Sequence, residues 1–266
     1  MNKVLAKFAL SASVYFGMFV MALFICAPIL TVNAASIRYE DACTIVLDGE
    51  IDKFTELHLR KAYDLIPKGC GTQATLHLNS TGGDVDAAMR ASYFVREKGI
   101  KTWINQNKSC ASACVLLFVA GVERFTLGRI GLHRPYSEKY SFSRSEATDS
   151  YEKINNRIRQ YLREMNIPEG LLDKMNSVPP GKIEWLETKH NTPELIEMHI
   201  VGTDPVWEDQ QDSAKAKKLG ISKKELYTRE QRAETICSQY SDKFFESERY
   251  GELYGNCYWD VISGRR

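Results

Sequence analysis

Three short segments of the chain contain the residue types that acyl transfer uses. Residues 79–84 include two adjacent glycines, residues 110–114 place a serine between two alanines, and residues 132–135 contain a histidine. A serine hydroxyl becomes a good nucleophile only when a base takes its proton, and histidine is the most frequent base. We therefore predict Ser112 as a nucleophile and His133 as its general base.

The residues around these positions indicate how they are presented. Gly82 and Gly83 lack side chains, so a ligand can approach their backbone N–H groups closely. Ser112 stands at the start of the apolar run 113–120, which predicts a buried helix that holds it rigidly. Taken singly, each residue also has a structural interpretation: a helix cap for Ser112, a turn for the glycines and a packing role for His133.

The order and spacing of the three segments resemble the proteolytic subunit of the Clp protease and its exported Clp-like relatives in the crotonase superfamily. The family's Asn-Ser-Pro-Gly-Gly loop is similar to residues 79–83, with Thr81 at the proline position. Its Ala-Ser-small nucleophile motif is similar to residues 111–113, and its hydrophobic-His-x-Pro motif is similar to residues 132–135.

The resemblance implies both a fold and an activity. It extends over residues 43–221 by element order, with the specific matches confined to residues 78–135, and it implies an α/β spiral of ββα units. It also implies a serine peptidase or hydrolase that forms an acyl-enzyme on Ser112, with the N–H groups of Gly83 and Ala113 as the oxyanion hole. A peptide or protein substrate and a homo-oligomer follow from the same resemblance.

The third member of the family's triad, an aspartate that orients the histidine, has no clean counterpart in this chain. The spacing ahead of residues 218–220 favours Glu208, and Asp204 and Asp209 are alternatives. The family's Ser-Met-Gly is also Ser-Ala-Cys here. A serine–histidine dyad without the acid retains part of the catalytic effect, so the missing motif leaves hydrolysis open.

The segments that must position these residues alternate between strand and helix patterns. Over residues 43–133 this alternation predicts a mostly parallel sheet with right-handed crossovers, and thus an α/β fold. The polar stretch 136–150 has no clear period, and we predict a flexible lid or groove edge there. Helical additions are predicted at residues 151–165, 168–175, 183–189 and 212–219.

The N-terminal segment has the layout of a secretory signal. Two lysines precede a charge-free stretch at 8–32, and small residues follow it. The stretch is also long enough to cross a bilayer, so an uncleaved membrane anchor is the alternative. We expect a signal peptide or anchor at 1–34, a ClpP/crotonase-like domain at 36–225, and a cysteine-containing extension at 226–266. The mature chain is then periplasmic or secreted.

Seven cysteines occur in the chain, and setting aside Cys26 in the N-terminal segment leaves six. An oxidising compartment favours disulfides between them. Nearness in sequence favours three pairs, which are Cys43 with Cys70, Cys110 with Cys114, and Cys237 with Cys257. The last pair staples the small C-terminal extension. A zinc site is the competing use, but no tight Cys-x-x-Cys or His-x-x-x-His spacing supports it, so no metal is expected.

Charge and motifs narrow the function classes. The formal net charge of +1 provides no strong field toward nucleic acid, so no nucleic-acid partner is expected. No Gly-x-x-x-x-Gly-Lys loop occurs, which indicates an ATP-independent protein without a cofactor. Contact with a membrane is expected only through an uncleaved N-terminal segment. Two alternatives to an exported peptidase remain: a catalytically silent peptide- or partner-binding protein on the same scaffold, and an acyl-CoA enzyme, which export disfavours.

Overall fold

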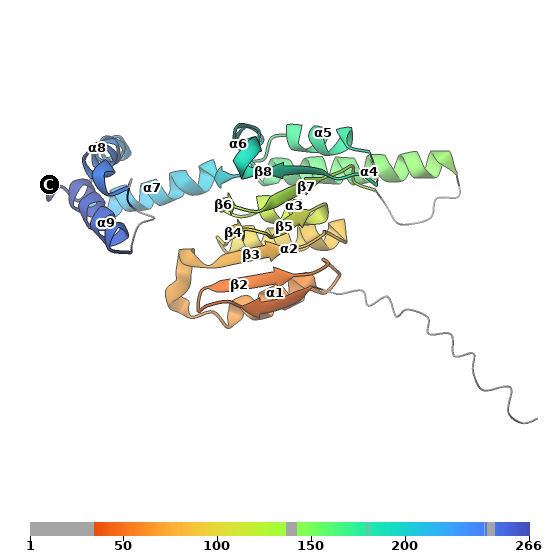
Figure 1. Ribbon diagram of the computed structural model, residues 1–266, viewed down its shortest axis with the longest axis horizontal. Helices are drawn as coiled ribbons and strands as arrows, with labels where there is room; N and C mark the ends of the chain where they lie inside the picture. The colour runs from red at the N-terminus through yellow and green to blue at the C-terminus, as the bar shows by residue number, and fades with distance from the viewer. Residues whose placement is uncertain (1–34, 137–142, 180, 242, 244–247) are drawn as a thin grey trace, which may run out of the picture. The chain divides into compact units, whose positions relative to one another are not determined.

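Two β-sheets of different size support the candidate catalytic segments (Figure 1). The computed structural model describes residues 35–136, 143–179, 181–241, 243 and 248–266. Within this part, one sheet has six strands and the other has three. The expectations for residues 1–34 lie outside the described residues, as does the stretch 137–142 of the predicted lid.

The six-stranded sheet is mostly parallel, as the strand–helix alternation predicts. Its strands are, in order, β1 (Ser36–Tyr39), β2 (Thr44–Asp48), β3 (Thr75–Asn79), β4 (Lys101–Ile104), β6 (Glu123–Thr126) and β9 (Gly202–Thr203). The series from β2 through β3 and β4 to β6 is parallel, and β1 and β9 are antiparallel edge strands.

Three helices pack on one face of this sheet. They are α1 (Thr55–Asp64) after β2, α2 (Val85–Glu97) after β3, and α3 (Ala113–Val119) before β6. Leu76 and Leu78 of β3 are buried in the core that these helices share. Because side chains alternate along a strand, His77, Trp103 and Phe125 lie on the opposite face, where their rings contact one another.

The three-stranded sheet carries the predicted nucleophile and base. Its strands are, in order, β5 (Ser109–Ala111), β7 (Arg129–Leu132) and β8 (Glu184–Glu187). β5 and β7 are parallel, so their carboxyl ends lie at the same edge, where Ser112 and His133 follow. A bridge between Ser80 and Cys110 attaches the loop after β3 to β5. The three predicted segments therefore meet at one edge of the small sheet.

The helix predicted over residues 183–189 is wrong at its start. Residues 184–187 form β8, antiparallel to β7, with Leu186 opposite Ile130. The helix α6 (Thr188–Glu197) begins only after this strand. A short apolar segment does not distinguish a helical period from a strand by itself, and pairing with the open edge of β7 decides the outcome.

The flexible stretch predicted at 136–150 is wrong from residue 143 onward. α4 (Arg144–Glu164) begins there, because Ser143 and Glu146 form a capping box. The Ser143 hydroxyl accepts from Glu146 N–H at 3.2 Å, and the Glu146 carboxylate accepts from Ser143 N–H at 2.9 Å. The Ser-x-x-Glu spacing is the sequence signal for this start. α5 (Gly170–Ser177) follows close to its predicted position.

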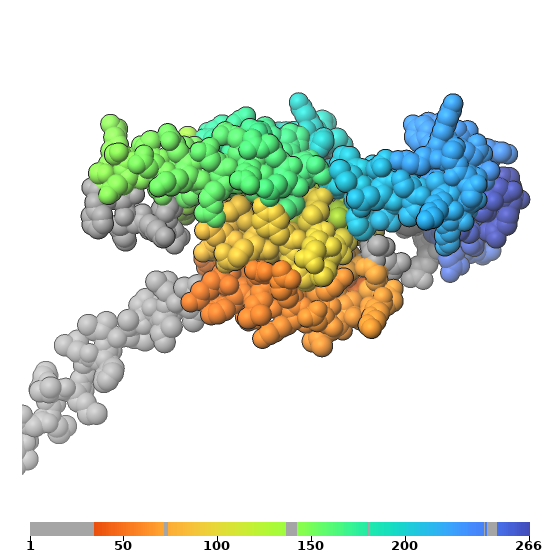
Figure 2. Space-filling model, turned by 180° about the vertical axis from the view of Figure 1, so that it is seen from behind, coloured from red at the N-terminus to blue at the C-terminus, as the bar shows by residue number. Residues whose placement is uncertain are grey.

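The helix that follows Ser112 is buried on every side. All seven residues of α3 are buried, as expected of a helix that is apolar all round. α2 lies beside it, and Figure 2 shows α2, in yellow, between α1 and α4. The ring pair Tyr63–Phe94 packs α1 against α2, and the ring pair Tyr93–Tyr161 packs α2 against α4. The core therefore gives Ser112 a rigid support.

The C-terminal part is helical. It contains α7 (Pro205–Leu219), α8 (Lys223–Ser241) and α9 (Glu248–Ile262). A disulfide joins Cys237 of α8 to Cys257 of α9 beside a small apolar cluster that includes Ala233 and Val261. The extension expected at 226–266 is thus a disulfide-linked pair of helices. Across the described residues, no helix is both long enough and apolar enough to cross a membrane.

Candidate active site

Ser112 lies at a sharp turn between β5 and α3. Its backbone has φ 57° and ψ −129°, a region that residues with a side chain rarely adopt. Its N–H donates to Gly131 O at 3.0 Å, and its carbonyl accepts from Val115 N–H at 3.0 Å, so the turn is anchored on both sides. A serine on a strained turn from strand to helix is the arrangement of a nucleophile elbow, which exposes the hydroxyl.

The side chain of Ser112 does not cap α3, although Ser112 occupies the N-cap position. The structural interpretation of this serine as a helix cap is therefore wrong. Instead, Ser112 lines a cavity of about 520 Å³ that His133 also lines. The hydroxyl is thus available to a molecule in the cavity.

Two glycines bring the loop after β3 up to the Ser112 turn. The φ angle is 105° at Gly82 and 133° at Gly83, values that favour glycine. A Cβ on Gly82 would lie 2.5 Å from Ser112 Cβ, and one on Gly83 would lie 2.1 Å from Ile51 O. Neither position has room for a side chain.

The backbone N–H groups of Gly83 and Ala113 are not used by the hydrogen bonds that hold the glycine loop and the first turn of α3. Ile51 N–H donates to Gly82 O at 2.7 Å, and Asp84 N–H donates to Ile51 O at 2.9 Å. In this parallel bridge the Gly83 N–H points away from Ile51. Ala113 is the first residue of α3, so its N–H has no acceptor within the helix. Both residues line the Ser112 cavity, as an oxyanion hole requires.

His133 follows β7 and is 8% exposed. Its Nδ1 lies 2.9 Å from Arg134 O. A carbonyl only accepts, so this hydrogen bond needs the proton on Nδ1 and leaves the lone pair on Nε2. That is the tautomer that a general base uses.

The carbonyl that orients His133 is itself held in place. Arg134 N–H donates to Val178 O at 3.0 Å. The Arg134 guanidinium donates twice to Asn176 O, at 3.0 and 2.8 Å. No local sequence signal assigns Arg134 a role, because its partners lie far along the chain, at the end of α5.

Ser112 and His133 are not joined by a hydrogen bond in the part of the chain that the structure describes. They share the walls of one cavity. Nucleophile–base contacts are often long before a substrate binds and shorten in the complex. The geometry therefore gives a common location for the two groups rather than a closed dyad.

The walls of this cavity are of two kinds. The apolar side chains that α2, α3, α4 and α5 contribute include Val85, Leu116, Ile154, Ile158 and Met175. The charged side chains are Glu50, Asp52, Lys53, Asp84, Asp86 and Arg157. Arg157 contacts Asp86 and so links α4 to α2 at the cavity. Asp84 accepts from Ala87 N–H at 2.8 Å and caps α2.

Asp204, one of the candidate acids, belongs to a buried charge cluster. Its carboxylate lies 2.6 Å from the guanidinium of Arg96, accepts from Asn166 Nδ2 at 3.0 Å, and caps α7 through Trp207 N–H at 2.9 Å. Burial raises the pKa of Asp204, but the hydrogen bonds from Asn166, Trp207 and Arg96 outweigh it and lower the pKa below its ordinary value. Asp204 is not among the residues that line the Ser112 cavity.

Glu208 and Asp209 lie on α7 and line a different cavity, of about 650 Å³, together with residues of α8 and α9. Asp209 forms an ion pair with Lys223. Within the described residues, none of the three candidate acids contacts His133, whose Nδ1 is bonded to Arg134 O. Glu208, the acid that the spacing favours, therefore lies on α7 and does not contact the histidine.

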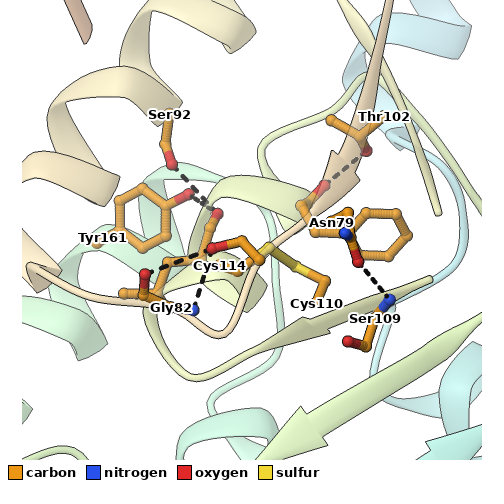
Figure 3. Close-up of a disulfide and its surroundings, with 11 residues drawn as sticks. Asn79, Gly82, Ser92, Thr102, Ser109, Cys110, Cys114 and Tyr161 are labelled. Carbon is orange, nitrogen blue, oxygen red and sulfur yellow. Dashed lines mark hydrogen bonds between the residues drawn. A yellow bond between two sulfur atoms is a disulfide. The ribbon is translucent and has the colours of Figure 1, made fainter. Parts of the chain in front are cut away.

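All six cysteines of the described residues form disulfides. The pairs are Cys43 with Cys70, Cys110 with Cys114, and Cys237 with Cys257. The first joins the residue before β2 to a short 3₁₀ helix, η1 (Lys68–Gln73). The second joins the residues two positions before and two positions after Ser112, and Figure 3 shows its two cysteines. In the described part of the chain, no cluster of three or more histidine, cysteine or acidic side chains is arranged to hold a metal ion.

Of three comparisons with known proteins, the one with solved structures found matches. No protein-family model and no curated protein sequence matches the chain. Among solved structures, a ClpP1 mutant from Listeria monocytogenes matches with 19% sequence identity and a TM-score of 0.45. The match covers 60% of this chain and 90% of that chain. The chain is similar to this ClpP-type structure at that level, and the likeness carries no conclusion about the fold family or the activity of this chain.

Proposed function

We propose that this chain is an exported, ATP-independent serine hydrolase that acts on peptide or protein substrates. One observation carries the proposal: Ser112, on a strained turn with a hydroxyl that does not cap its helix, shares a cavity with His133. Residues in such backbone conformations persist only when their surroundings impose them, and they cluster at active sites.

In the proposed reaction, Ser112 Oγ attacks the carbonyl carbon of the scissile bond while His133 Nε2 accepts the hydroxyl proton. The carbonyl oxygen becomes an oxyanion and accepts hydrogen bonds from the N–H groups of Gly83 and Ala113. His133 then gives the proton to the leaving amine, and the acyl group stays on Ser112. Water hydrolyses this ester, with His133 as base, and restores the serine.

The proposal has a histidine oriented by a backbone carbonyl instead of a carboxylate. Arg134 O fixes the tautomer of His133, as the family's aspartate does. A neutral carbonyl stabilises the imidazolium less than a carboxylate does. We therefore expect slower acylation than in an enzyme with a complete triad.

The proposed location is the periplasm or the cell exterior. The three disulfides support it, because such bonds persist in oxidising compartments and are rare in the cytosol. Assembly of several copies, which the Clp resemblance implies, is part of the same proposal.

A fluorophosphonate probe tests the proposal directly, since it forms a covalent bond with an activated serine. We expect the wild-type chain to be labelled and Ser112→Ala to lose the label completely. His133→Gln should label far more slowly. Ser177→Ala is the control, because Ser177 is exposed and its hydroxyl donates to Lys174 O at 2.7 Å, away from the cavity.

A peptide-binding protein without catalysis is the second candidate. Two features of the described residues favour it: Ser112 makes no hydrogen bond to His133, and no carboxylate contacts the histidine. In that case the folded wild-type chain stays unlabelled at every pH between about 6 and 9. Peptides would then bind Ser112→Ala as tightly as the wild-type chain.

A further inference from the structure

The conformation of Ser112 needs a cause, because the combination of φ 57° with ψ −129° is one that a residue with a side chain rarely adopts. The strand before it excludes a helical alternative. Ala111 N–H donates to Ser80 O at 3.0 Å and Ser112 N–H donates to Gly131 O at 3.0 Å, so the chain is held between two strand-like partners up to Ser112. A helix could begin earlier only by breaking both hydrogen bonds.

The Cys110–Cys114 disulfide excludes an extended alternative. It joins the residue two positions before Ser112 to the residue two positions after it, with the two Cα atoms 5.3 Å apart. An extended chain of five residues would separate the same atoms by about 13 Å. The two hydrogen bonds before Ser112 exclude a helix, and the disulfide excludes an extended chain. A tight turn at Ser112 satisfies both constraints.

The elements on either side of the turn are held by contacts that do not involve the disulfide. Figure 3 shows Tyr161 and Ser92 on one side of the disulfide and Thr102 on the other. The hydroxyls of Tyr161 and Ser92 donate to Leu116 O at 2.5 and 3.2 Å, and Thr102 Oγ1 donates to Phe118 O at 2.7 Å. α3 therefore keeps its place without the disulfide, and the part of the chain that depends on it is the turn itself.

We propose that the Cys110–Cys114 disulfide is a positioning device for Ser112, and that the site is competent only while this bond is intact. The inference rests on the proposed hydrolase function of Ser112. It makes Cys110 and Cys114 positioning residues, which act on the substrate only through the serine. It also makes the activity sensitive to a dithiol reductant.

The redox step is a thiol–disulfide exchange with a dithiol. A thiolate of the reductant attacks one sulfur, the Cys110–Cys114 bond breaks, and a mixed disulfide forms. The second thiol of the reductant displaces the remaining cysteine. Two electrons pass from the reductant, which becomes a disulfide, and the two thiol protons end on Cys110 and Cys114. Both cysteines are fully buried, so the exchange requires the turn to open first.

A pair of double variants tests the proposal. Cys110→Ala/Cys114→Ala removes the disulfide at the turn, and Cys237→Ala/Cys257→Ala removes the remote one as a matched control. Two quantities are measured: the rate of fluorophosphonate labelling, and hydrogen exchange of the backbone amides at 109–116. We expect the turn variant to label at least about tenfold more slowly and to exchange faster at these amides, because Ser112 relaxes out of its strained conformation. The control should match the wild-type chain in both.

A second arm opens the turn disulfide by reduction in an already folded chain, with both cysteines of the turn kept. In a chain with Cys43, Cys70, Cys237 and Cys257 replaced by alanine, the turn disulfide is the one left in the described part. Treatment with dithiothreitol should abolish labelling, and reoxidation should restore it at the original rate. A disulfide that only adds stability would leave the labelling rate of the folded fraction, and its pH profile, unchanged on reduction.

The outcomes separate this inference from the proposed function. If the wild-type chain labels and the turn variant labels equally fast, the positioning role is overturned and the hydrolase stands. If the wild-type chain does not label, the hydrolase proposal fails, and hydrogen exchange alone decides the positioning role. Faster exchange at 109–116 on loss of the disulfide then supports it, and unchanged exchange refutes it.

Discussion

The disulfide at the Ser112 turn and the disulfide between α8 and α9 are the same covalent bond in two different settings. Cys110 and Cys114 lie four residues apart inside the main hydrophobic core, next to a helix whose residues are all buried. Cys237 and Cys257 lie 20 residues apart and belong to a cluster of five buried residues. The first pair is surrounded by the side chains of a large core. The second pair lies where few side chains are buried, and the covalent bond takes over part of the stabilising role of a core.

The two settings imply different roles for the two disulfides. A pair of helices with so few buried apolar residues gains its stability from the cross-link, because the core alone does not offset the entropy of ordering the chain. A short cross-link inside a dense core adds little stability, since its surroundings already order the chain. What it adds is a constraint on backbone conformation at the one residue that needs it.

The largest effect on stability is expected at Asp204, the residue that caps α7. Asp204→Ala should lower the free energy of unfolding by about 3 kcal/mol or more, because it leaves the Arg96 guanidinium without its partner. The labelling rate of the folded fraction should stay unchanged, which distinguishes a structural carboxylate from a triad member. Urea unfolding followed by labelling measures both, and Asp209→Ala, on the same helix and exposed, is the control. A selective loss of labelling would restore Asp204 as a catalytic candidate.

Asp204 also predicts a pH dependence. Its folded-state pKa is lowered, so its contribution to stability is complete above the unfolded-state value of about 4 and is lost as pH falls through the folded-state pKa. Asp204→Asn should flatten this part of the curve of stability against pH. Denaturation of both chains between neutral pH and the acid range measures it, and parallel curves would contradict the expectation.

The next effect is the loss of the remote disulfide. Cys237→Ala/Cys257→Ala should destabilise the α8–α9 pair by about 3 kcal/mol, the value expected for a loop of this length. Faster hydrogen exchange should be confined to residues 223–262. Faster exchange that spreads into α3 would contradict this expectation, because it would show that the α8–α9 pair and the Ser112 turn are coupled.

A somewhat smaller effect, on the labelling rate, is expected at Gly82, which lies against Ser112. Gly82→Ala should slow labelling by about a hundredfold, because its Cβ would displace Ser112 and the adjacent oxyanion donor. Gly220→Ala is the matched control: its φ is 67°, yet a Cβ there meets nothing within 4 Å. That variant should cost stability through backbone strain and leave labelling intact. Equal labelling of the two variants would show that the Ser112 turn tolerates displacement.

The smallest effect is expected at the start of α4. Ser143→Ala removes one half of the capping box and should cost about 1 kcal/mol, with fraying limited to the first turn. Amide exchange at residues 144–150 measures it. Labelling should not change, since the cavity-lining residues of α4 lie further along, at Ile154, Arg157 and Ile158. A slower labelling rate would mean that the whole helix shifts.

Local signals in the sequence determine the elements that carry the site. The run from Asp84 to Gly99 contains a cap, an apolar period and a stop, and the helix Val85–Glu97 lies between them. The order of the glycine loop, the serine and the histidine along a parallel strand series brings them to one sheet edge. The cap, the apolar period and the stop depend on residues within a few positions of each other, and the order of the three segments is read directly along the chain, so the sequence alone indicates both.

Tertiary contacts decide what the same signals leave open. The φ of Ser112 follows from pairing with Gly131 and from the bond to Cys114, neither of which is a property of the serine. Residues 184–187 become a strand because β7 offers them an edge. His133 is oriented by the carbonyl of Arg134, whose guanidinium donates to Asn176 O, 42 residues away along the chain. Asp204 forms an ion pair with Arg96. Spacing along the chain places a residue near a site, but only the packed structure decides which groups touch.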